Sequence, residues 1–191
     1  MNKINAIFVL ALFFSFSVEG SGTASSFDKQ TPAQLESLES LAAAGNEKAQ
    51  MKLANMYLEG KIVTTDTNKA LYYYRLAADR DIAFAQYKLA KLYLDGKYLE
   101  PDPEQALTWL LRASKLGLIQ AQLSLGLEYE KGVNTPQDFI QAHKWLEIAS
   151  SLTDKDLKST MEELETKMTF IELAHAKLLS NICIITGYQV C

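Results

Sequence analysis

The chain has 191 residues, of which 22% are charged and 48% hydrophobic, and its formal net charge is −4. A chain of this length forms one domain of typical size, with enough apolar side chains to build a buried core. The acidic balance lacks the basic footprint of nucleic-acid-binding proteins, so we expect no nucleic-acid partner.

Residues 1–24 have the pattern of a signal peptide. The uncharged segment Ile4–Val18 spans 15 residues. A signal-peptide core has about 7–15 apolar residues, whereas a transmembrane helix needs roughly 20. Small residues near Gly20 and Ala24 provide cleavage sites. We expect export to the periplasm or the medium, with a short flexible leader over 25–30 and no integral membrane span after cleavage. An uncleaved N-terminal anchor is the alternative.

A leading helix is expected over residues 31–48, ahead of the repeats described next. Pro32 suits the first position of a helix, and Gly45 follows the end of the helical pattern. Gly45 lies 72 residues before Gly117, which is twice the 36-residue period of the central region. The segment therefore corresponds to the second half of an incomplete leading repeat.

The central region repeats with a period of 36 residues, and we place the repeats at 49–84, 85–120 and 121–153. Eight sets of residues recur at this step. They are Ala49, Ala85 and Ala121; Gln50, Gln86 and Gln122; Leu53, Leu89 and Leu125; Tyr57, Tyr93 and Tyr129; Gly60, Gly96 and Gly132; Asp66, Asp102 and Asp138; Ala70, Ala106 and Ala142; and Ala77, Ala113 and Ala149. A period in this range indicates stacked supersecondary units that share one continuous core.

Each repeat has the pattern of a helical hairpin. In the first helix the recurring Ala, Leu and Tyr are four residues apart and share one face, and the recurring Gly follows where a helix commonly ends. The recurring Asp is a suitable N-cap for the second helix, and Pro103 directly after Asp102 strengthens this prediction. We expect the large rings of Tyr73, Trp109 and Trp145 in the second helices to be buried between repeats.

These residues carry a family resemblance. The pattern A-x3-L-[GA]-x2-Y-x2-G, followed by D-x3-A-x2-[WY]-x3-A, resembles the Sel1-like repeat, a relative of the tetratricopeptide repeat, over roughly residues 49–151. The resemblance implies an all-α solenoid, a superhelix of stacked helical hairpins, that acts as a protein-interaction module and has no cofactor. The family usually carries a second glycine where this chain has Ile62, Tyr98 and Asn134, so we expect the inter-helix loops to differ from the family's path.

Residues 154–182 are strongly helical in composition and are expected to cap the array. Two apolar faces occur in this segment. One consists of Leu157, Met161, Leu164 and Met168, and the other of Ile171, Ala174 and Leu178. The glutamates between these faces suit the polar outer surface that a terminal repeat needs to stay soluble.

The tail 183–191 contains the chain's two cysteines, Cys183 and Cys191. In an oxidising compartment an even number of cysteines predicts pairing, and the spacing C-x4-Y-x2-C resembles the ending of many secreted Sel1-like proteins. We expect a structural disulfide that closes a short terminal loop. A free redox pair is the alternative, which the absence of C-x-x-C spacing disfavours.

Signs of catalysis are nearly absent from the sequence. His143 and His175 fall on predicted helices without a His or Cys partner at metal-ligand spacing, so we expect both to be ordinary surface or cap residues. No phosphate loop and no G-x-S-x-G motif occurs, and we predict no enzyme and no metal site. The alternative is a weak penicillin-binding or β-lactamase-type hydrolase, an activity linked to some cysteine-rich Sel1-like proteins. Those proteins carry cysteine pairs within each repeat, which this chain lacks.

The candidate binding residues lie on the side of the first helices opposite to the recurring Ala, Leu and Tyr. They are Met51, Asn55, Tyr87, Lys91 and Leu127. Neighbouring repeats cover part of this side, and the remainder would line the inner curve, where repeat proteins bind partner segments. The predicted function is that of an exported protein–protein interaction module or scaffold in the bacterial cell envelope. A purely structural envelope protein is a further alternative.

Overall fold

The computed structural model describes residues 32–153 and 157–191. The predicted signal peptide and leader lie outside the described residues. Within the described ranges all regular structure is helical, with no strand, and no helix is long and apolar enough to cross a membrane. The predicted all-α fold is therefore confirmed.

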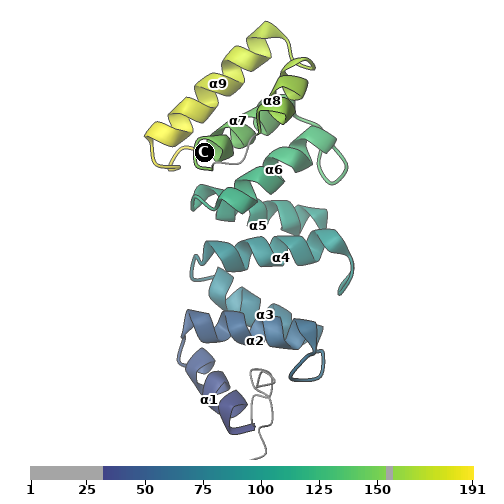
Figure 1. Ribbon diagram of the computed structural model, residues 1–191, viewed down its shortest axis with the longest axis vertical. Helices are drawn as coiled ribbons and strands as arrows, with labels where there is room; N and C mark the ends of the chain where they lie inside the picture. Colours follow the sequence, from purple (N-terminus) through teal and green to yellow (C-terminus); the bar gives the residue numbers. More distant parts are fainter. Residues whose placement is uncertain (1–31, 154–156) are drawn as a thin grey trace, which may run out of the picture.

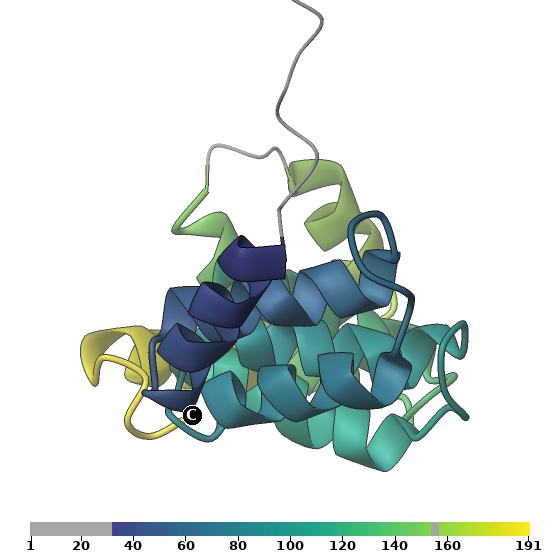
Figure 2. The same ribbon diagram turned by 90° about the horizontal axis from the view of Figure 1, so that it is seen from below.

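The helices follow one another along an elongated stack (Figure 1). They are α1 (Pro32–Ala43), α2 (Glu47–Glu59), α3 (Thr67–Ala78), α4 (Ala83–Asp95), α5 (Pro103–Lys115), α6 (Ile119–Lys131), α7 (Phe139–Ser150), α8 (Lys158–Glu165) and α9 (Phe170–Ile185). Three hairpins, α2–α3, α4–α5 and α6–α7, form the body of a solenoid, and α1 packs against α2 ahead of them. The view from the α1 end shows the successive hairpins lying behind one another (Figure 2).

Each hairpin is closed by the same hydrogen bonds at its recurring Asp. The Asp carboxylate caps the second helix by accepting a hydrogen bond from the backbone N–H three residues later, at 2.9–3.0 Å. Its own backbone N–H donates to the carbonyl of the recurring Tyr in the first helix, at 2.9–3.0 Å. The recurring Gly ends the first helix with φ between 62° and 67°, a left-handed conformation that glycine adopts without steric cost. Ile62, Tyr98 and Asn134 have no positive φ.

Each junction between a second helix and the next first helix contains one buried side-chain hydrogen bond. The recurring Gln of the first helix donates from Nε2 to the backbone carbonyl eight residues earlier. The pairs are Gln50 with Ala42, Gln86 with Ala78, and Gln122 with Ser114, at 3.0, 3.0 and 3.1 Å. Because Gln50 bonds to Ala42 at the end of α1, α1 takes the place of a preceding second helix.

The aromatic series of the second helices is not buried uniformly, which corrects our expectation for Tyr73 and Trp109. Trp145 is fully buried, whereas these two rings are only partly buried. Full burial in all three second helices occurs one position later, at Tyr74, Leu110 and Leu146. Trp145 shares an apolar cluster with Cys183 of α9. Helix α9 therefore helps to bury Trp145, whereas Tyr73 and Trp109 have no such helix over them.

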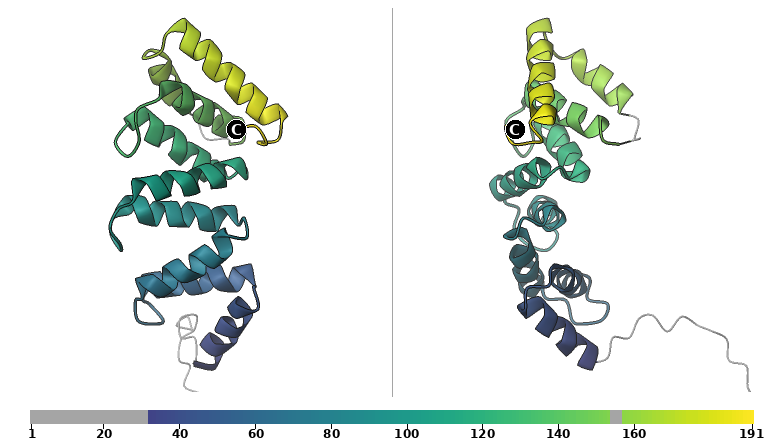
Figure 3. Two further views of the ribbon diagram at one scale, coloured as in Figure 1. Left: turned by 180° about the vertical axis from the view of Figure 1, so that it is seen from behind. Right: turned by 90° about the vertical axis from the view of Figure 1, so that its left-hand side faces the viewer.

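The chain beyond α7 forms a cap of two helices, and α9 packs along α7 (Figure 3). The predicted apolar face of α8 is buried at Leu157 and Leu164. In contrast, α9 buries Ala176, Ser180 and Cys183 and leaves most of its second predicted face in solvent.

The tail after α9 is closed by a disulfide between Cys183 and Cys191, as predicted, with a Cα–Cα distance of 5.1 Å. Cys183 is fully buried, and Tyr188 packs against the same apolar cluster as Trp145. The tail is therefore packed against the third hairpin rather than merely tied to α9.

Candidate protein-binding site

The first helices α2, α4 and α6 carry all of the predicted binding residues on one side. We call this side the first-helix face, and it is defined by Met51, Asn55, Tyr87, Lys91 and Leu127. It points away from the stripe of recurring Ala, Leu and Tyr, which is buried in α2 and α4; in α6 the Ala and Leu are buried and Tyr129 is partly buried.

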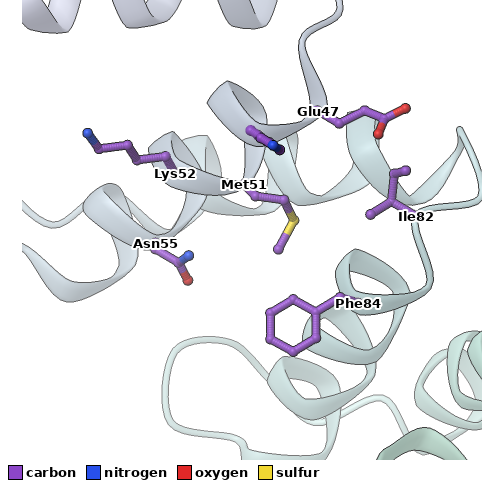
Figure 4. A pocket seen from close by; sticks show the side chains of 7 residues that line it. Glu47, Met51, Lys52, Asn55, Ile82 and Phe84 are labelled. Carbon is purple, nitrogen blue, oxygen red and sulfur yellow. The ribbon is translucent and has the colours of Figure 1, made fainter. Parts of the chain in front are cut away.

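A pocket of about 460 Å³ lies between α2 and α4 on the first-helix face. Met51 of α2 and Phe84 of α4 point toward the same space, with Ile82 beside them (Figure 4). Phe84 is 43% exposed, so a large apolar surface is accessible to solvent there. We call this cavity the α2–α4 pocket. Its size suits one or two side chains of a bound peptide.

The rim of the α2–α4 pocket is mostly cationic. Lys48 and Lys52 line it from α2, where Glu47 is the acidic lining residue. Lys88 of α4 places its Nζ 5.2 Å from the centroid of the Phe84 ring, within the range of a cation–π contact. Within the described part of the chain, none of the three lysines forms an ion pair. Their ammonium groups are therefore available to an external carboxylate.

Asn55 lines the same pocket and is held by a buried hydroxyl. The Tyr74 hydroxyl donates a hydrogen bond of 2.6 Å to Asn55 Oδ1. Burial raises the pKa of Tyr74 to about 12, so this hydroxyl keeps its proton and remains a donor throughout the neutral range. The orientation leaves the amide Nδ2 of Asn55 without a hydrogen bond in the described residues. It can donate to a group in the pocket.

Tyr87 and Lys91 line a second, smaller cavity of about 220 Å³ between α2, α3 and α4. Lys91 is less available than the rim lysines, because its Nζ lies 3.1 Å from Asp95 Oδ1. The Tyr87 and Phe84 ring centroids are 6.3 Å apart, which places the two cavities next to each other. Four of the five predicted residues therefore line two adjoining cavities of the first two repeats.

Leu127 of α6 lies apart from these four residues. It packs in an apolar cluster that contains Leu146 of α7 and Leu164 of α8. The cap thus uses this part of the first-helix face for its own packing, and the open part of the face belongs to the first two repeats.

Comparison with known proteins accounts for this architecture. The Sel1 repeat pattern matches residues 47–82, 83–118 and 119–154, three consecutive segments of 36 residues. The chain belongs to the Sel1 repeat family. Sel1 repeats are protein–protein interaction modules, and the family is a non-catalytic scaffold fold. A search of curated proteins finds no match.

Two solved structures are similar to the chain. A Sel1 repeat protein from Oxalobacter formigenes is 30% identical, with a TM-score of 0.61, over 68% of this chain and 97% of that one. A protective antigen present in uropathogenic Escherichia coli strains is 28% identical, with a TM-score of 0.55, over 83% of this chain. The chain spans only 42% of that antigen.

Sequence reasoning missed three residues of the α2–α4 pocket: Lys48, Lys52 and Phe84. The signal for the two lysines is helical spacing, because Lys48 lies three residues before Met51 and Lys52 lies three residues before Asn55. Phe84 occupies the position of Lys48 in the next Sel1 repeat, 36 residues later. Extending the face by one turn toward the helix N-terminus would have found all three.

His143 is not a surface residue, which corrects the sequence prediction. It is fully buried, with Nε2 3.1 Å from Glu165 Oε1 and Nδ1 3.5 Å from Glu147 Oε2. The hydrogen bond from His143, followed by Lys177, lowers the pKa of Glu165. Glu147 also accepts a hydrogen bond of 2.7 Å from the Ser180 hydroxyl. Helical spacing within α7 did not reveal this burial, because Glu165 and Ser180 come from the cap.

The polar cluster around His143 has the wrong connectivity for nucleophilic catalysis. Ser180 is fully buried, and its hydroxyl donates to a carboxylate rather than to the imidazole ring. A serine nucleophile needs a hydrogen bond to its general base and access to a substrate. Among residues 32–153 and 157–191, no group of three or more potential metal ligands occurs. We interpret the cluster as a structural link that holds the cap on α7.

Proposed function

We propose that this Sel1 repeat protein is an exported interaction module of the bacterial cell envelope, and that it binds a segment of a partner protein on the first-helix face of repeats one and two. The observation that carries the proposal is the α2–α4 pocket, where Met51 and the 43% exposed Phe84 form an apolar floor in solvent. An accessible apolar cavity with a few polar groups around it is the usual form of a binding site.

The binding part of this proposal can be tested with a photoreactive amino acid in place of Tyr87. Tyr72 of α3, which is 58% exposed, is the matched control away from the first-helix face. We expect a crosslinked partner from position 87 and none from position 72. With that partner purified, Tyr87→Ala should weaken binding about tenfold, as truncation of an aromatic hot spot does. Equal crosslinking from both positions would contradict the proposal.

Export is supported by the composition of residues 1–24 and by the disulfide of the tail, because disulfides persist mainly in oxidising compartments. Mass spectrometry of the protein from the envelope fraction should find a chain that begins between residues 21 and 25. A full-length chain in the membrane fraction would instead favour an uncleaved anchor.

A further inference from the structure

We propose that the α2–α4 pocket binds an acidic segment of the partner protein. One bulky apolar side chain of the segment would pack on Met51 and Phe84, and carboxylates on either side of it would pair with Lys48, Lys52 and Lys88. This inference rests on the proposed function and specifies the chemistry of the bound segment.

Charge is the first argument. The whole chain has a net charge of −4, yet two lysines, Lys48 and Lys52, line this pocket against one acidic residue, Glu47. A third lysine, Lys88, lies over the Phe84 ring beside it. Two other lysines, in contrast, are held by carboxylates: Lys91 pairs with Asp95, and Lys167 pairs with Glu130 at 3.1 Å. An excess of cations around an accessible pocket is complementary to an acidic ligand and disfavours a basic one.

The apolar floor is the second argument, because it selects a ligand that is not uniformly acidic. Met51 is flexible and adapts its shape to an incoming side chain, and the Phe84 ring offers a rigid face. Lys88 lies over that ring, with its methylene groups free to cover the edge of a bound side chain while its ammonium group stays accessible. The arrangement fits one leucine, methionine or phenylalanine flanked by carboxylates.

Asn55 adds a hydrogen-bond donor for the main chain of a bound segment. Its Oδ1 is already occupied by the Tyr74 hydroxyl at 2.6 Å, so the side chain presents N–H donors to the pocket. A backbone carbonyl of an extended or helical segment is a suitable acceptor beside an apolar anchor. The pocket therefore provides an apolar contact, charged contacts and a main-chain contact to one short peptide.

The test uses a fluorescein-labelled octapeptide in which one central leucine is flanked by glutamates. Residues 25–191 of the chain are titrated into this peptide, and binding is measured by fluorescence anisotropy. Two matched peptides replace either the glutamates by glutamines or the leucine by glycine. We expect the first peptide to bind, and both replacements to weaken binding by about tenfold or more. Binding should weaken as salt rises, because the rim charges are exposed. If the peptide with glutamines around its leucine binds equally well, the proposal is wrong.

The protein variants locate the site. The triple variant Lys48→Glu, Lys52→Glu, Lys88→Glu should weaken binding by about tenfold or more, while Lys131→Glu, an exposed lysine at the end of α6, should change it by less than about twofold. Phe84→Ala should weaken binding at every salt concentration, because it removes an apolar contact. Circular dichroism confirms that each variant is folded. Lys52→Glu alone makes the same change of charge as Lys131→Glu and should weaken binding more. If the two single variants weaken binding equally, the effect is one of overall charge and the proposal is wrong.

Failure of this inference differs from failure of the proposed function. A partner that crosslinks from position 87, together with an acidic peptide that does not bind, would reject the acidic ligand and keep the interaction face. If the acidic peptide binds to the pocket but no partner crosslinks from position 87, the wider first-helix face has no binding role in cells. The two experiments therefore test the two claims separately.

Discussion

The second helices α5 and α7 occupy equivalent positions in successive repeats but have different surroundings. α5 fully buries a single stripe, from Ala106 to Ser114, and its remaining positions are partly buried or exposed. α7 buries a continuous run from Ala142 to Leu146, which covers more than one full turn. The cause is the cap, because α9 packs along α7 and Leu164 of α8 joins the cluster of Ala142 and Leu146.

This difference shows how the same repeat position acquires a different role at the end of the array. Lys144 of α7 corresponds to Thr108 of α5 and Tyr72 of α3, which are both exposed, yet Lys144 is only 5% exposed. Burying the charged ammonium group of Lys144 lowers the stability of the folded state. The lysines at the α2–α4 pocket keep their hydration and can be used in binding. The third repeat, which the cap covers, contributes mainly to stability. The first two repeats keep their first-helix face exposed and available for binding.

The largest expected effect separates the two tryptophans of the second helices. Trp145→Ala removes a fully buried ring and should destabilise the protein by about 3–5 kcal/mol. Trp109→Ala removes a partly buried ring from the equivalent position, so its loss of unfolding free energy should be clearly smaller than that of Trp145→Ala. Urea unfolding followed by far-UV circular dichroism measures both free energies. Equal losses would show that the cap does not distinguish the two repeats.

A second test concerns the buried lysine. Burial lowers the pKa of Lys144 to about 8, with nearby Lys115 adding to the shift. The unfolded chain keeps an ordinary lysine pKa of about 10.4, so the folded state binds the proton less tightly. Lys144→Met, which conserves volume, should therefore stabilise the protein by at most about 3 kcal/mol at neutral pH, since each pKa unit corresponds to about 1.4 kcal/mol.

The gain from Lys144→Met should shrink as the pH rises from 8 toward 10, because Lys144 then loses its proton in the folded state of the wild type. Thermal unfolding of both proteins across this range measures the change. Lys131→Met, at an exposed position, is the control and should show no such trend. A destabilised Lys144→Met variant would mean that the contact between Lys144 and the Trp145 ring, 4.4 Å from Nζ to the ring centroid, outweighs the cost of burial.

The smallest expected effect concerns the tail. Cys191→Ser opens the disulfide and leaves the fully buried Cys183 in place. A loop this short contributes about 2–3 kcal/mol in the chain-entropy description. The variant should remain folded, with a C-terminus that proteases trim more readily, and thiol labelling of the wild type should require reductant. Unchanged trimming would show that the packing of Tyr188 holds the tail without the disulfide.

The fold was predictable because the same helix-forming and helix-ending residues recur in each repeat. Ala, Leu and Tyr at four-residue spacing define each first helix, and Asp102 before Pro103 marks the start of a second one. These signals are local, so no tertiary contact was needed to interpret them. The disulfide was also predictable, because only two cysteines are present.

The burial of α7 was not predictable, because it depends on contacts with residues far along the chain. His143 meets Glu165 across 22 residues, and its helical position alone resembles that of a solvent-facing residue. Leu127 was assigned to the binding face for the same reason, since nothing in α6 shows that the cluster of Leu164 would cover it. The periodic pattern predicts which residues share a face, and only the packing of the cap decides whether that face stays open.

The recurring glutamine bond has a consequence for how such arrays change their length. Its acceptor is a main-chain carbonyl, so the identity of the accepting residue is immaterial: Ala42, Ala78 and Ser114 serve equally well. With respect to this hydrogen bond, every junction is therefore interchangeable with the next. Duplication or loss of one 36-residue unit leaves the remaining junctions with their donors and acceptors intact. Descendants of such a gene can lengthen or shorten the molecule in whole repeats while every junction keeps this hydrogen bond.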